Sequence, residues 1–180
     1  DIGFVTTPMM YFAVSSRNLD GGIIVTASHN PAEWNGFKLT REKGIMVSQG
    51  FGMEEIKDIV LAEKFNKVDA IGKISQVNIV EDYKKFILSK INGSSKKLKI
   101  VLDPGNGSAC FIAEDLLKKA GHNVVTINGN PDGTFPSRPS DPIEENVHRL
   151  KEEVVKNKAD IGIALDGDAD RVAFVDNLGN

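Results

Sequence analysis

Short apolar runs alternate with helix-type patterns along almost the whole chain, and this alternation constrains the fold more than any other feature. The runs with strand-like length and residue content are 2–5, 22–27, 36–40, 98–103, 123–127, 160–165 and 171–176. Apolar residues recur at helical spacing over 52–64, 80–91, 113–120 and 143–157. A first helix is expected to begin with Thr7 as its N-cap and Pro8 at N1. The alternation predicts an α/β layer architecture.

We place a domain boundary near residue 75, with one domain expected over 1–75 and a second over 76–180. The predicted helix 80–91 could close the first domain or open the second, and the polar stretch NGSSKK at 92–97 is expected to be an exposed loop or a linker. The sequence opens directly as a strand and ends inside a turn signal. We therefore expect it to be a fragment of a longer protein.

Composition narrows the class of protein. The 180 residues can bury a sizeable core, and a net charge of -3 leaves no basic footprint for nucleic acid or an anionic membrane. No apolar run approaches the roughly 20 residues that span a bilayer. The start of the chain lacks the pattern of a signal peptide. The single cysteine, Cys110, cannot form an internal disulfide, so a cytoplasmic setting is expected.

Three aspartates stand at alternate positions in ALDGDADR, residues 164–171, directly after an apolar run. Asp166, Asp168 and Asp170 would repel one another without compensation, and their oxygens suit a hard divalent cation. An EF-hand is excluded, because its required glycine and glutamate positions hold other residues. The planar fork of Arg171 suits a phosphate beside the metal. The pattern favours a metal site over a solvated polar turn.

A second constellation begins at GGIIVTASHNP, residues 21–31, where an apolar strand ends in a polar turn containing Ser28. The Asn35-Gly36 pair is a tight-turn signal that would aim Lys38 back toward this serine. A Ser–His hydrolase is disfavoured, because no G-x-S-x-G elbow surrounds the serine and His29 is its direct neighbour. From these residues alone, an inert polar loop is as good an interpretation as a functional one.

The stretch DPGNGSA, residues 103–109, is a glycine turn between a strand and a helix. A dinucleotide-binding fingerprint would need a third glycine where Cys110 stands. We interpret the stretch as a structural turn, although the N-terminus of a helix can also receive an anion.

Together, TASHNP at 26–31, NGFK at 35–38 and DGDADR at 166–171 closely resemble the α-D-phosphohexomutase superfamily, which includes phosphomannomutase/phosphoglucomutase and phosphoglucosamine mutase. Further similar motifs are TP at 7–8, DPGNGS at 103–108 and PDGTFP at 131–136. The resemblance runs nearly end to end. It implies a fragment of a four-domain mutase: the later part of domain 1 and all of domain 2, as two small three-layer α/β/α domains with mixed sheets.

The resemblance also assigns roles to residues. It implies that Ser28 carries the phosphoryl group and that Asp166, Asp168 and Asp170 are Mg²⁺ ligands, joined by an oxygen of the phosphorylated serine. Many members have glycine where this chain has Ala169, a small change that leaves the motif intact.

Three further side chains match positions of the family that act on the reacting group. Arg171 would contact the phosphate of the phosphoserine, and Lys38 and His29 match positions associated with proton transfer and charge stabilisation. A phosphoserine carries a charge of about -1.5 to -2, so a dication flanked by Lys38 and Arg171 could hold it in place. Phosphoryl transfer needs chiefly this kind of positioning and fixed positive charge.

The implied reaction interconverts hexose 1-phosphate and hexose 6-phosphate through the phosphoserine and a sugar bisphosphate, with an activator of the glucose 1,6-bisphosphate type. The partners are then a phosphosugar and the missing domains 3 and 4 of the same chain. Without those domains, we expect little or no mutase activity from this chain alone.

Two other classes of function stay open from the sequence. The first is a Mg²⁺-dependent phosphatase of the haloacid dehalogenase type, in which an aspartate rather than a serine is the nucleophile. The second is a non-catalytic phosphosugar-binding module that keeps the fold and the acidic turn.

Overall fold

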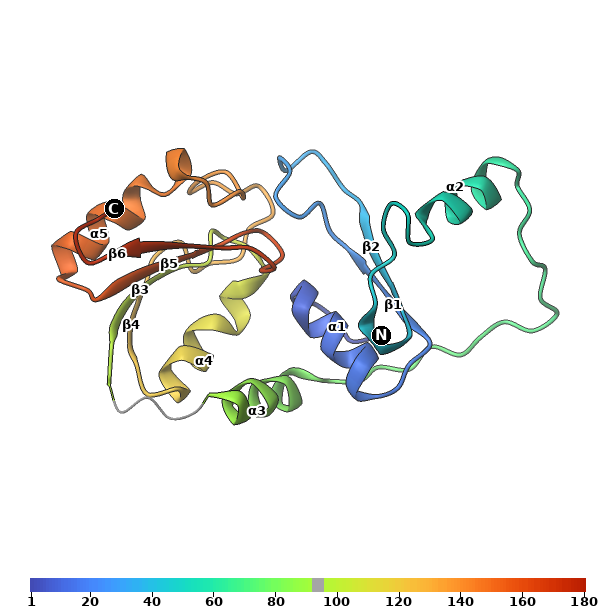
Figure 1. The fold of residues 1–180 in the computed structure, drawn as a ribbon, viewed down its shortest axis with the longest axis horizontal. Coiled ribbons are helices and arrows are strands. Elements are labelled where there is room, and N and C mark those ends of the chain that lie inside the picture. The colour runs from blue at the N-terminus through green and yellow to red at the C-terminus, as the bar shows by residue number, and fades with distance from the viewer. Residues whose placement is uncertain (92–95) are drawn as a thin grey trace.

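The computed structural model describes residues 1–91 and 96–180 and contains two α/β units side by side (Figure 1). The helices are α1 (Thr7–Ser16), α2 (Met53–Leu61), α3 (Val80–Lys90), α4 (Ala113–Lys119) and α5 (His148–Asn157). The strands are β1 (Gly21–Val25), β2 (Phe37–Arg41), β3 (Lys99–Asp103), β4 (Asn123–Thr126), β5 (Ile161–Leu165) and β6 (Val172–Asp176). Short 3₁₀ turns cover Glu42–Gly44, Ser108–Phe111 and Glu144–Asn146. The α/β class predicted from the alternating pattern is confirmed, with two separate sheets.

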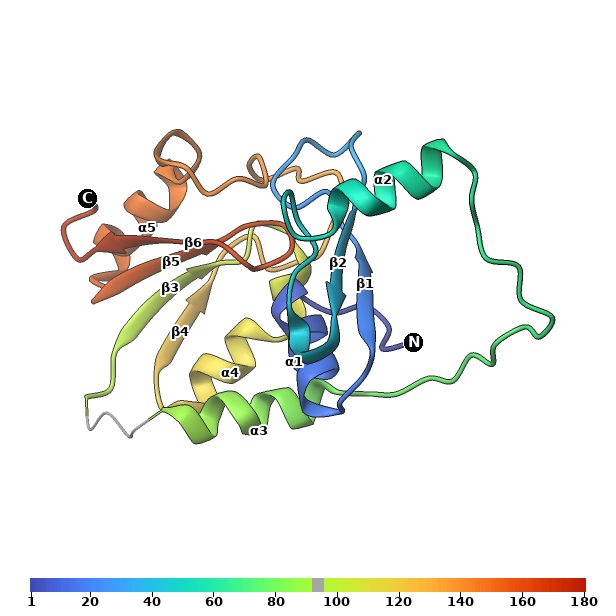
Figure 2. The same cartoon turned by 45° about the vertical axis from the view of Figure 1, so that its right-hand side comes forward.

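The second unit is built on a mixed sheet with the strand order β4-β3-β5-β6. β4, β3 and β5 are parallel, and β6 returns antiparallel to β5 at the edge (Figure 2). The helix α5 lies on one face of the sheet and α4 on the other, which gives three layers. The core between α5 and the sheet is apolar and buried, and consists of Val101, Ile127, Val147, Leu150, Val154, Ala159, Ala164 and Val175.

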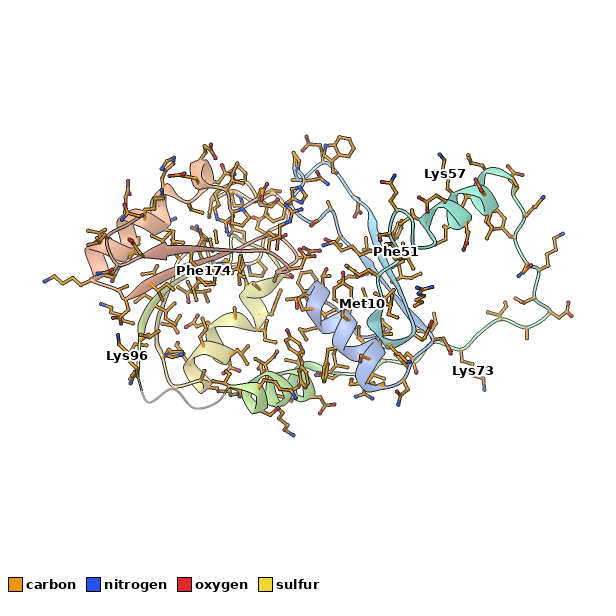
Figure 3. The ribbon with its side chains drawn as sticks, in the orientation of Figure 1. Met10, Phe51, Lys57, Lys73, Lys96 and Phe174 are labelled. Atoms are coloured by element: carbon orange, nitrogen blue, oxygen red, sulfur yellow. The ribbon has the colours of Figure 1, made fainter. Side chains whose placement is uncertain are left out.

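The first unit is smaller. β1 and β2 form an antiparallel pair, and α1 packs against it through Met10, which is buried and accepts a hydrogen bond from Thr40 Oγ1 (3.6 Å to Sδ; Figure 3). Within the described residues β1 has a strand neighbour on one side only. Its outward residues Ile23 and Val25 are 66% and 62% exposed.

A second apolar cluster joins the two units. Met9 and Ala13 of α1 pack with Ile79, at the start of α3, and with Ile112, which precedes α4. All four side chains are buried. The helix α3 contacts both α1 and α4, so it lies beneath the junction in both views. The relative position of the two units is therefore supported by apolar burial as well as by polar contacts.

Three details differ from the sequence-based expectations. Residues 2–5 form no strand, because among the described residues no strand pairs with them. The first helix begins at Thr7 itself, and the residue with extended N-cap dihedral angles is Thr6, one position earlier than predicted. The segment predicted as one helix over 143–157 is divided, because Val147 at φ -107° and ψ 17° separates a 3₁₀ turn from α5.

Two predictions concern the segments that link the helices and strands. The predicted boundary between residues 75 and 76 falls in the extended stretch that joins α2 to α3, and it stays a prediction. Residues 92–95 of the predicted loop or linker at 92–97 lie outside the described residues. Among the helices formed by the described residues, none combines the length and the apolar character needed to cross a bilayer.

Candidate active site

Ser28 follows the end of β1 in a tight, strained loop. Its backbone N–H donates to Thr26 Oγ1 (2.8 Å), and the N–H of Thr26 donates to the carbonyl of Gly36 across the turn (2.9 Å). Ser28 has φ 57°, a left-handed conformation that residues with a side chain rarely adopt. Such conformations persist only where the surroundings hold them, and they gather at functional sites.

Lys38 faces Ser28 from the neighbouring strand. The antiparallel register pairs it with Ile24, and its ammonium lies 3.1 Å from Ser28 Oγ. The same Nζ atom lies 2.6 Å from Asp168 Oδ2 and 2.5 Å from Asp170 Oδ2. Burial alone would lower the pKa of Lys38, but the hydrogen bonds to the two carboxylates outweigh it and raise the pKa. The lysine therefore stays positively charged at neutral pH.

The three aspartates of the acidic loop converge after β5. Asp166, Asp168 and Asp170 each offer a carboxylate oxygen, and these oxygens lie within 4.8 Å of one another. The side chains of Asp166 and Asp168 are buried. At the turn, Ala169 has φ 62°, again a left-handed conformation. One cation can therefore be reached by all three carboxylates.

The two buried carboxylates differ in their environment. Burial raises the pKa of Asp166 to about 6, although backbone N–H groups of the loop oppose the shift. Burial acts in the same direction on Asp168, but hydrogen bonds from Lys38 and Thr7 outweigh it and its pKa is lowered. Asp166 Oδ1 accepts the N–H groups of Asp170 (3.0 Å) and Arg171 (3.1 Å). Its Oδ2 is buried and has no hydrogen-bond partner among the described residues.

An unpartnered, buried carboxylate oxygen is costly unless something compensates it. Here the oxygen belongs to a cluster of hard oxygen donors, the ligand type that Mg²⁺ and Ca²⁺ prefer. The residues present thus fit a divalent cation.

The Ser28 loop and the acidic loop touch directly. Ser28 Oγ lies 3.5 Å from Asp168 Oδ1 although the two residues are 140 positions apart. A methyl group at Gly167 would come within 2.6 Å of the backbone oxygen of Ser28, so only glycine allows this approach. The family resemblance implies that Ser28 and the aspartates share one metal ion, and the two loops do meet at this point.

The glycine turn at 103–108 packs against the backbone of the acidic loop at Gly167. A methyl group at Gly107 would come within 2.7 Å of the backbone oxygen of Gly167, and the N–H of Ser108 donates to the same oxygen (2.9 Å). These contacts agree with the interpretation of the stretch as a structural turn.

A buried ion pair holds the ends of β3 and β5 together. Arg138 Nε donates to Asp103 Oδ2 (2.8 Å), and its Nη2 donates to the carbonyl of Leu165 (2.7 Å), the residue before the acidic loop. Two residues further on, Ser140 Oγ donates to the carbonyl of Asn30 in the serine loop (3.2 Å). Arg138 is not among the predicted site residues, because an isolated arginine in a loop carries no local signal of burial.

Two threonines outside the predicted set of site residues also contact the acidic loop. Thr7 Oγ1 donates to Asp168 Oδ2 (2.6 Å), and the N–H of Thr7 donates to the carbonyl of Asp168 (3.0 Å). Thr26 Oγ1 donates to the same Oδ2 atom (3.1 Å). The local sequence predicts Thr7 as a helix N-cap, and no spacing pattern links it to a residue 161 positions away.

The two remaining candidates are less closely engaged. His29 Nδ1 lies 3.5 Å from Ser28 Oγ, at the outer limit of a hydrogen bond. The guanidinium of Arg171 is half exposed and pairs with Asp141 at 3.8 Å rather than with the serine. Of the predicted site residues, Ser28, Lys38 and the three aspartates therefore lie together in the structure. His29 is only at the limit of hydrogen-bond distance from Ser28, and the guanidinium of Arg171 points to Asp141.

Comparison with known proteins identifies the family of the chain. The family model described as phosphoglucomutase/phosphomannomutase, alpha/beta/alpha domain I, matches residues 1–67, and the one for alpha/beta/alpha domain II matches residues 80–179. The chain is 44% identical to a phosphoglucosamine mutase from Caldicellulosiruptor bescii over 99% of its own length and 40% of that protein. It is 42% identical to a probable phosphoglucosamine mutase from Methanosarcina acetivorans, with 99% and 41% covered.

Among solved structures, a phosphoglucomutase/phosphomannomutase family protein from Burkholderia thailandensis matches with a TM-score of 0.90 and 32% identity. That match covers all of this chain and 40% of the other. The chain thus spans about 40% of the length of the relatives that it matches. Because both family models match in order and together cover most of its residues, the chain belongs to the phosphoglucomutase/phosphomannomutase family, within the α-D-phosphohexomutase superfamily.

Proposed function

We propose that this chain is the phosphoryl-carrying and metal-binding part of a Mg²⁺-dependent phosphohexomutase that interconverts hexose 1-phosphate and hexose 6-phosphate. The observation that carries the proposal is the junction at Ser28. Its hydroxyl oxygen lies 3.1 Å from the half-buried ammonium of Lys38 and 3.5 Å from Asp168, one of the three clustered carboxylates. A serine hydroxyl between a fixed cation and a metal-ligand set is arranged to carry a phosphoryl group.

The charge balance supports a phosphoserine rather than a free hydroxyl as the working state. A phosphate on Ser28 would bring a charge of about -1.5 to -2 next to three aspartates. Lys38 alone cannot offset this charge. A divalent cation held by Asp166, Asp168, Asp170 and a phosphoserine oxygen would neutralise it and stabilise the charge that develops on the moving group.

The transfer itself would exchange one P–O bond for another. A hydroxyl of the bound sugar phosphate attacks phosphorus as the bond from phosphorus to Ser28 Oγ breaks, and the attacking hydroxyl loses its proton while Ser28 Oγ regains one. Reversal with the other phosphate of the bisphosphate restores the phosphoserine. Lys38 is placed to hold positive charge at Oγ in both directions.

His29 and Arg171 have lesser parts in this proposal. His29 could accept or return the proton if the gap of 3.5 Å to Oγ shortens when substrate binds. Arg171 is half exposed and only loosely paired with Asp141, so it is free to swing toward a phosphate on Ser28.

The names of the relatives suggest which sugar to test first. Phosphoglucosamine mutase is the name of several relatives that are 38% to 44% identical, so glucosamine phosphate is the first substrate to try, followed by glucose and mannose phosphates. The sugar would have to be selected by parts of the protein beyond these residues. We therefore expect this chain alone to show little or no turnover in a coupled mutase assay.

Intact-mass spectrometry of the full-length protein tests the proposal. Incubation with glucose 1,6-bisphosphate and Mg²⁺ should add one phosphate, mapped to Ser28, and Ser28→Ala should abolish both the phosphate and the turnover. Ser16→Ala, at the exposed end of α1, is the matched control and should leave both unchanged.

The same measurement separates the alternatives. The family assignment disfavours a phosphatase of the haloacid dehalogenase type, but an aspartyl phosphate that persists in Ser28→Ala would support it against the mutase. A full-length protein that binds phosphosugars and never acquires phosphate would support a binding module instead.

A further inference from the structure

One oxygen of Asp168 receives three hydrogen bonds while the other receives almost none. Oδ2 lies 2.6 Å from Thr7 Oγ1, 3.1 Å from Thr26 Oγ1 and 2.6 Å from Lys38 Nζ. Oδ1 has a single long contact of 3.5 Å, to Ser28 Oγ. A carboxylate has about four lone-pair directions over its two oxygens, so Oδ2 is fully used and Oδ1 is left for another partner.

The two oxygens of Asp166 also differ in their hydrogen bonding, but the donors are different. Its Oδ1 accepts two backbone N–H groups of the acidic loop, and its Oδ2 is buried without a partner among the described residues. In each of these two carboxylates, one oxygen is fixed by the protein and the other is open. For Asp166 the loop supplies the donors itself. For Asp168 they come from the other unit of the molecule.

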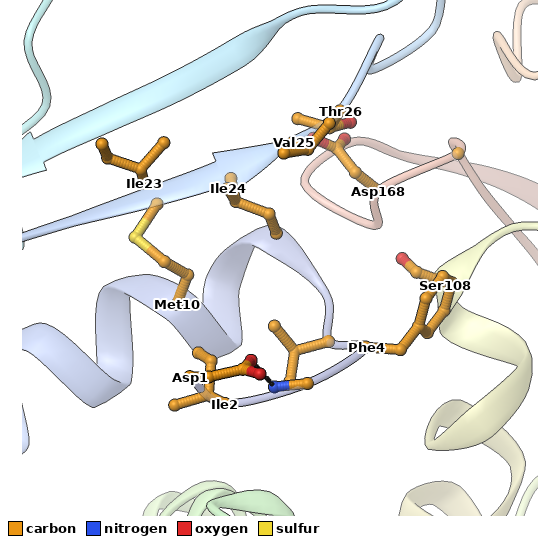
Figure 4. A pocket seen from close by; sticks show the side chains of 13 residues that line it. Asp1, Ile2, Phe4, Met10, Ile23, Ile24, Val25, Thr26, Ser108 and Asp168 are labelled. Atoms are coloured by element: carbon orange, nitrogen blue, oxygen red, sulfur yellow. Dashed lines mark hydrogen bonds between the residues drawn. The ribbon is translucent and has the colours of Figure 1, made fainter. Parts of the chain in front are cut away.

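Thr26 connects the serine to this carboxylate. Its Oγ1 accepts the backbone N–H of Ser28 (2.8 Å) and donates to Asp168 Oδ2 (3.1 Å). Because the hydroxyl has one hydrogen, accepting from Ser28 directs that hydrogen to Asp168. Figure 4 shows the side chains of Thr26 and Asp168 meeting where β1 ends, at the rim of a cleft of about 610 Å³.

Thr7 holds Asp168 at two points. Its N–H donates to the carbonyl and its hydroxyl to the carboxylate of the same aspartate. Thr7 opens α1, so no preceding turn of helix offers a carbonyl that could compete for the hydroxyl. The residue is fully buried, and its branched side chain has few rotamers, which presets the direction of the hydroxyl.

We infer that Thr7 and Thr26 are positioning residues: together they fix the Asp168 carboxylate so that Oδ1 faces the cation and the phosphorylated serine. The inference rests on the proposed function, since it assigns an orientation to a metal ligand. The effect of the two threonines is to set the distance and angle between the serine loop and the acidic loop.

Threonine-to-valine changes in the full-length protein test the inference, because valine keeps the shape and removes only the hydroxyl. With Mn²⁺ as the probe ion, Thr7→Val and Thr26→Val should each weaken binding about 10- to 100-fold, the usual range for residues that orient a metal ligand. Thr7→Ser and Thr26→Ser keep the hydroxyl, so their Mn²⁺ affinity should stay closer to that of the parent protein than the affinity of the valine variants does. The matched control is Thr40→Val, a buried threonine of β2 whose hydroxyl contacts Met10 Sδ, and it should leave Mn²⁺ affinity unchanged.

Steady-state kinetics provide a second measurement, because a variant that only affected folding would not change kcat selectively. Once the enzyme is saturated with metal, both valine variants should lower kcat with little change in KM for the sugar phosphate. Valine variants that fold normally and bind Mn²⁺ as tightly as Thr40→Val would overturn the inference.

Amide hydrogen exchange without metal separates this inference from the proposed function. Thr26→Val should speed exchange of the Ser28 amide, which loses its acceptor, and Thr7→Val should speed exchange over residues 166–171. If the parent protein binds no Mn²⁺, the proposed metal site fails, but faster exchange would still support the positioning role. Unchanged exchange in both variants would refute that role independently of the metal.

Discussion

The two loops that meet at Ser28 are supported in different ways. The acidic loop continues from β5 of a four-stranded sheet with helices on both faces, and Arg138 anchors the end of that strand. The serine loop extends from a two-stranded pair whose outer residues Ile23 and Val25 face solvent. The acidic loop therefore extends from a four-stranded frame, whereas the serine loop extends from only two strands and adds contacts with Asp168 and Ser140 of the other unit. The following variants test this difference, from the largest expected effect to the smallest.

Arg138→Met should have the largest effect, because it leaves Asp103 as an uncompensated charge with its side chain 1% exposed. Removing one partner of a buried ion pair typically costs about 3–5 kcal/mol. We expect a loss of this size in the free energy of unfolding, measured by urea denaturation. Arg149→Met, which removes an exposed arginine of the same unit, is the control. Equal losses in the two variants would contradict the anchoring role.

Two core truncations should distinguish the core of the second unit from the apolar cluster that joins the two units. Leu150→Ala opens the core between α5 and the sheet, and Ile79→Ala opens the cluster that joins the units; each should cost about 2–5 kcal/mol. Hydrogen exchange should locate the damage in β3, β5 and β6 for the first variant and in α1 for the second. If both variants speeded hydrogen exchange in the same segments, the two apolar clusters would not support different parts of the molecule.

Gly167→Ala acts on the contact between the loops. The added methyl group would meet the backbone oxygen of Ser28 at 2.6 Å, and relieving such overpacking costs about 1–3 kcal/mol. We expect slower phosphorylation of Ser28 from glucose 1,6-bisphosphate, followed by mass spectrometry, with a modest loss of stability. Gly133→Ala adds a methyl group where no atom lies within 4 Å, so it should change neither quantity.

Ala169→Gly should raise stability. The alanine has φ 62°, and glycine adopts this conformation without the cost that a β-carbon imposes. We expect a gain of about 0.5–1 kcal/mol in the free energy of unfolding. Ala113→Gly, placed in the first turn of α4, should instead lose a similar amount. A loss in both variants would mean that the acidic loop is not strained at this residue.

The smallest effect concerns pH and the helix beneath the junction. Lys84 of α3 pairs with Asp115 of α4 at 2.6 Å, and its hydrogen bond lowers the pKa of Asp115 below the ordinary value of 3.8. A carboxyl group with a lowered pKa in the folded state adds stability above its unfolded pKa, and this contribution is lost as the pH falls through the folded value.

Asp115→Asn should therefore lower Tm slightly at pH 7, and this difference should shrink as the pH falls below 3.8. The exposed Glu55→Gln in α2 serves as the control. A Tm difference between Asp115→Asn and the parent protein that did not shrink on acidification would contradict the assigned pair.

Local patterns in the sequence predicted the parts of this molecule that depend on local physics. The strands of the second sheet, the helices α2 to α4 and the meeting of Lys38 with Ser28 follow from periodicity and from a tight-turn signal. The alternating aspartates follow from their own repulsion, which only a shared cation or a buried partner relieves.

What could not be predicted depends on contacts distant in sequence. Thr7 looks like any residue at the start of a helix until the fold brings it to Asp168, 161 positions away. Residues 2–5 have the composition of a strand but lack a strand to pair with among the described residues. Arg171 is predicted to contact the phosphoserine, and in the structure its guanidinium instead lies 3.8 Å from Asp141.

The open side of β1 bears on how the protein behaves in concentrated solution. Among the described residues no strand pairs with this edge, and a strand with an unpaired edge and apolar outward residues is a template for strands of other molecules. The edge lies at the cleft shown in Figure 4, whose lining is mainly apolar. A preparation of residues 1–180 should therefore self-associate as its concentration rises, and a lysine in place of Ile23 should suppress this self-association while Ser28 and the acidic loop stay intact.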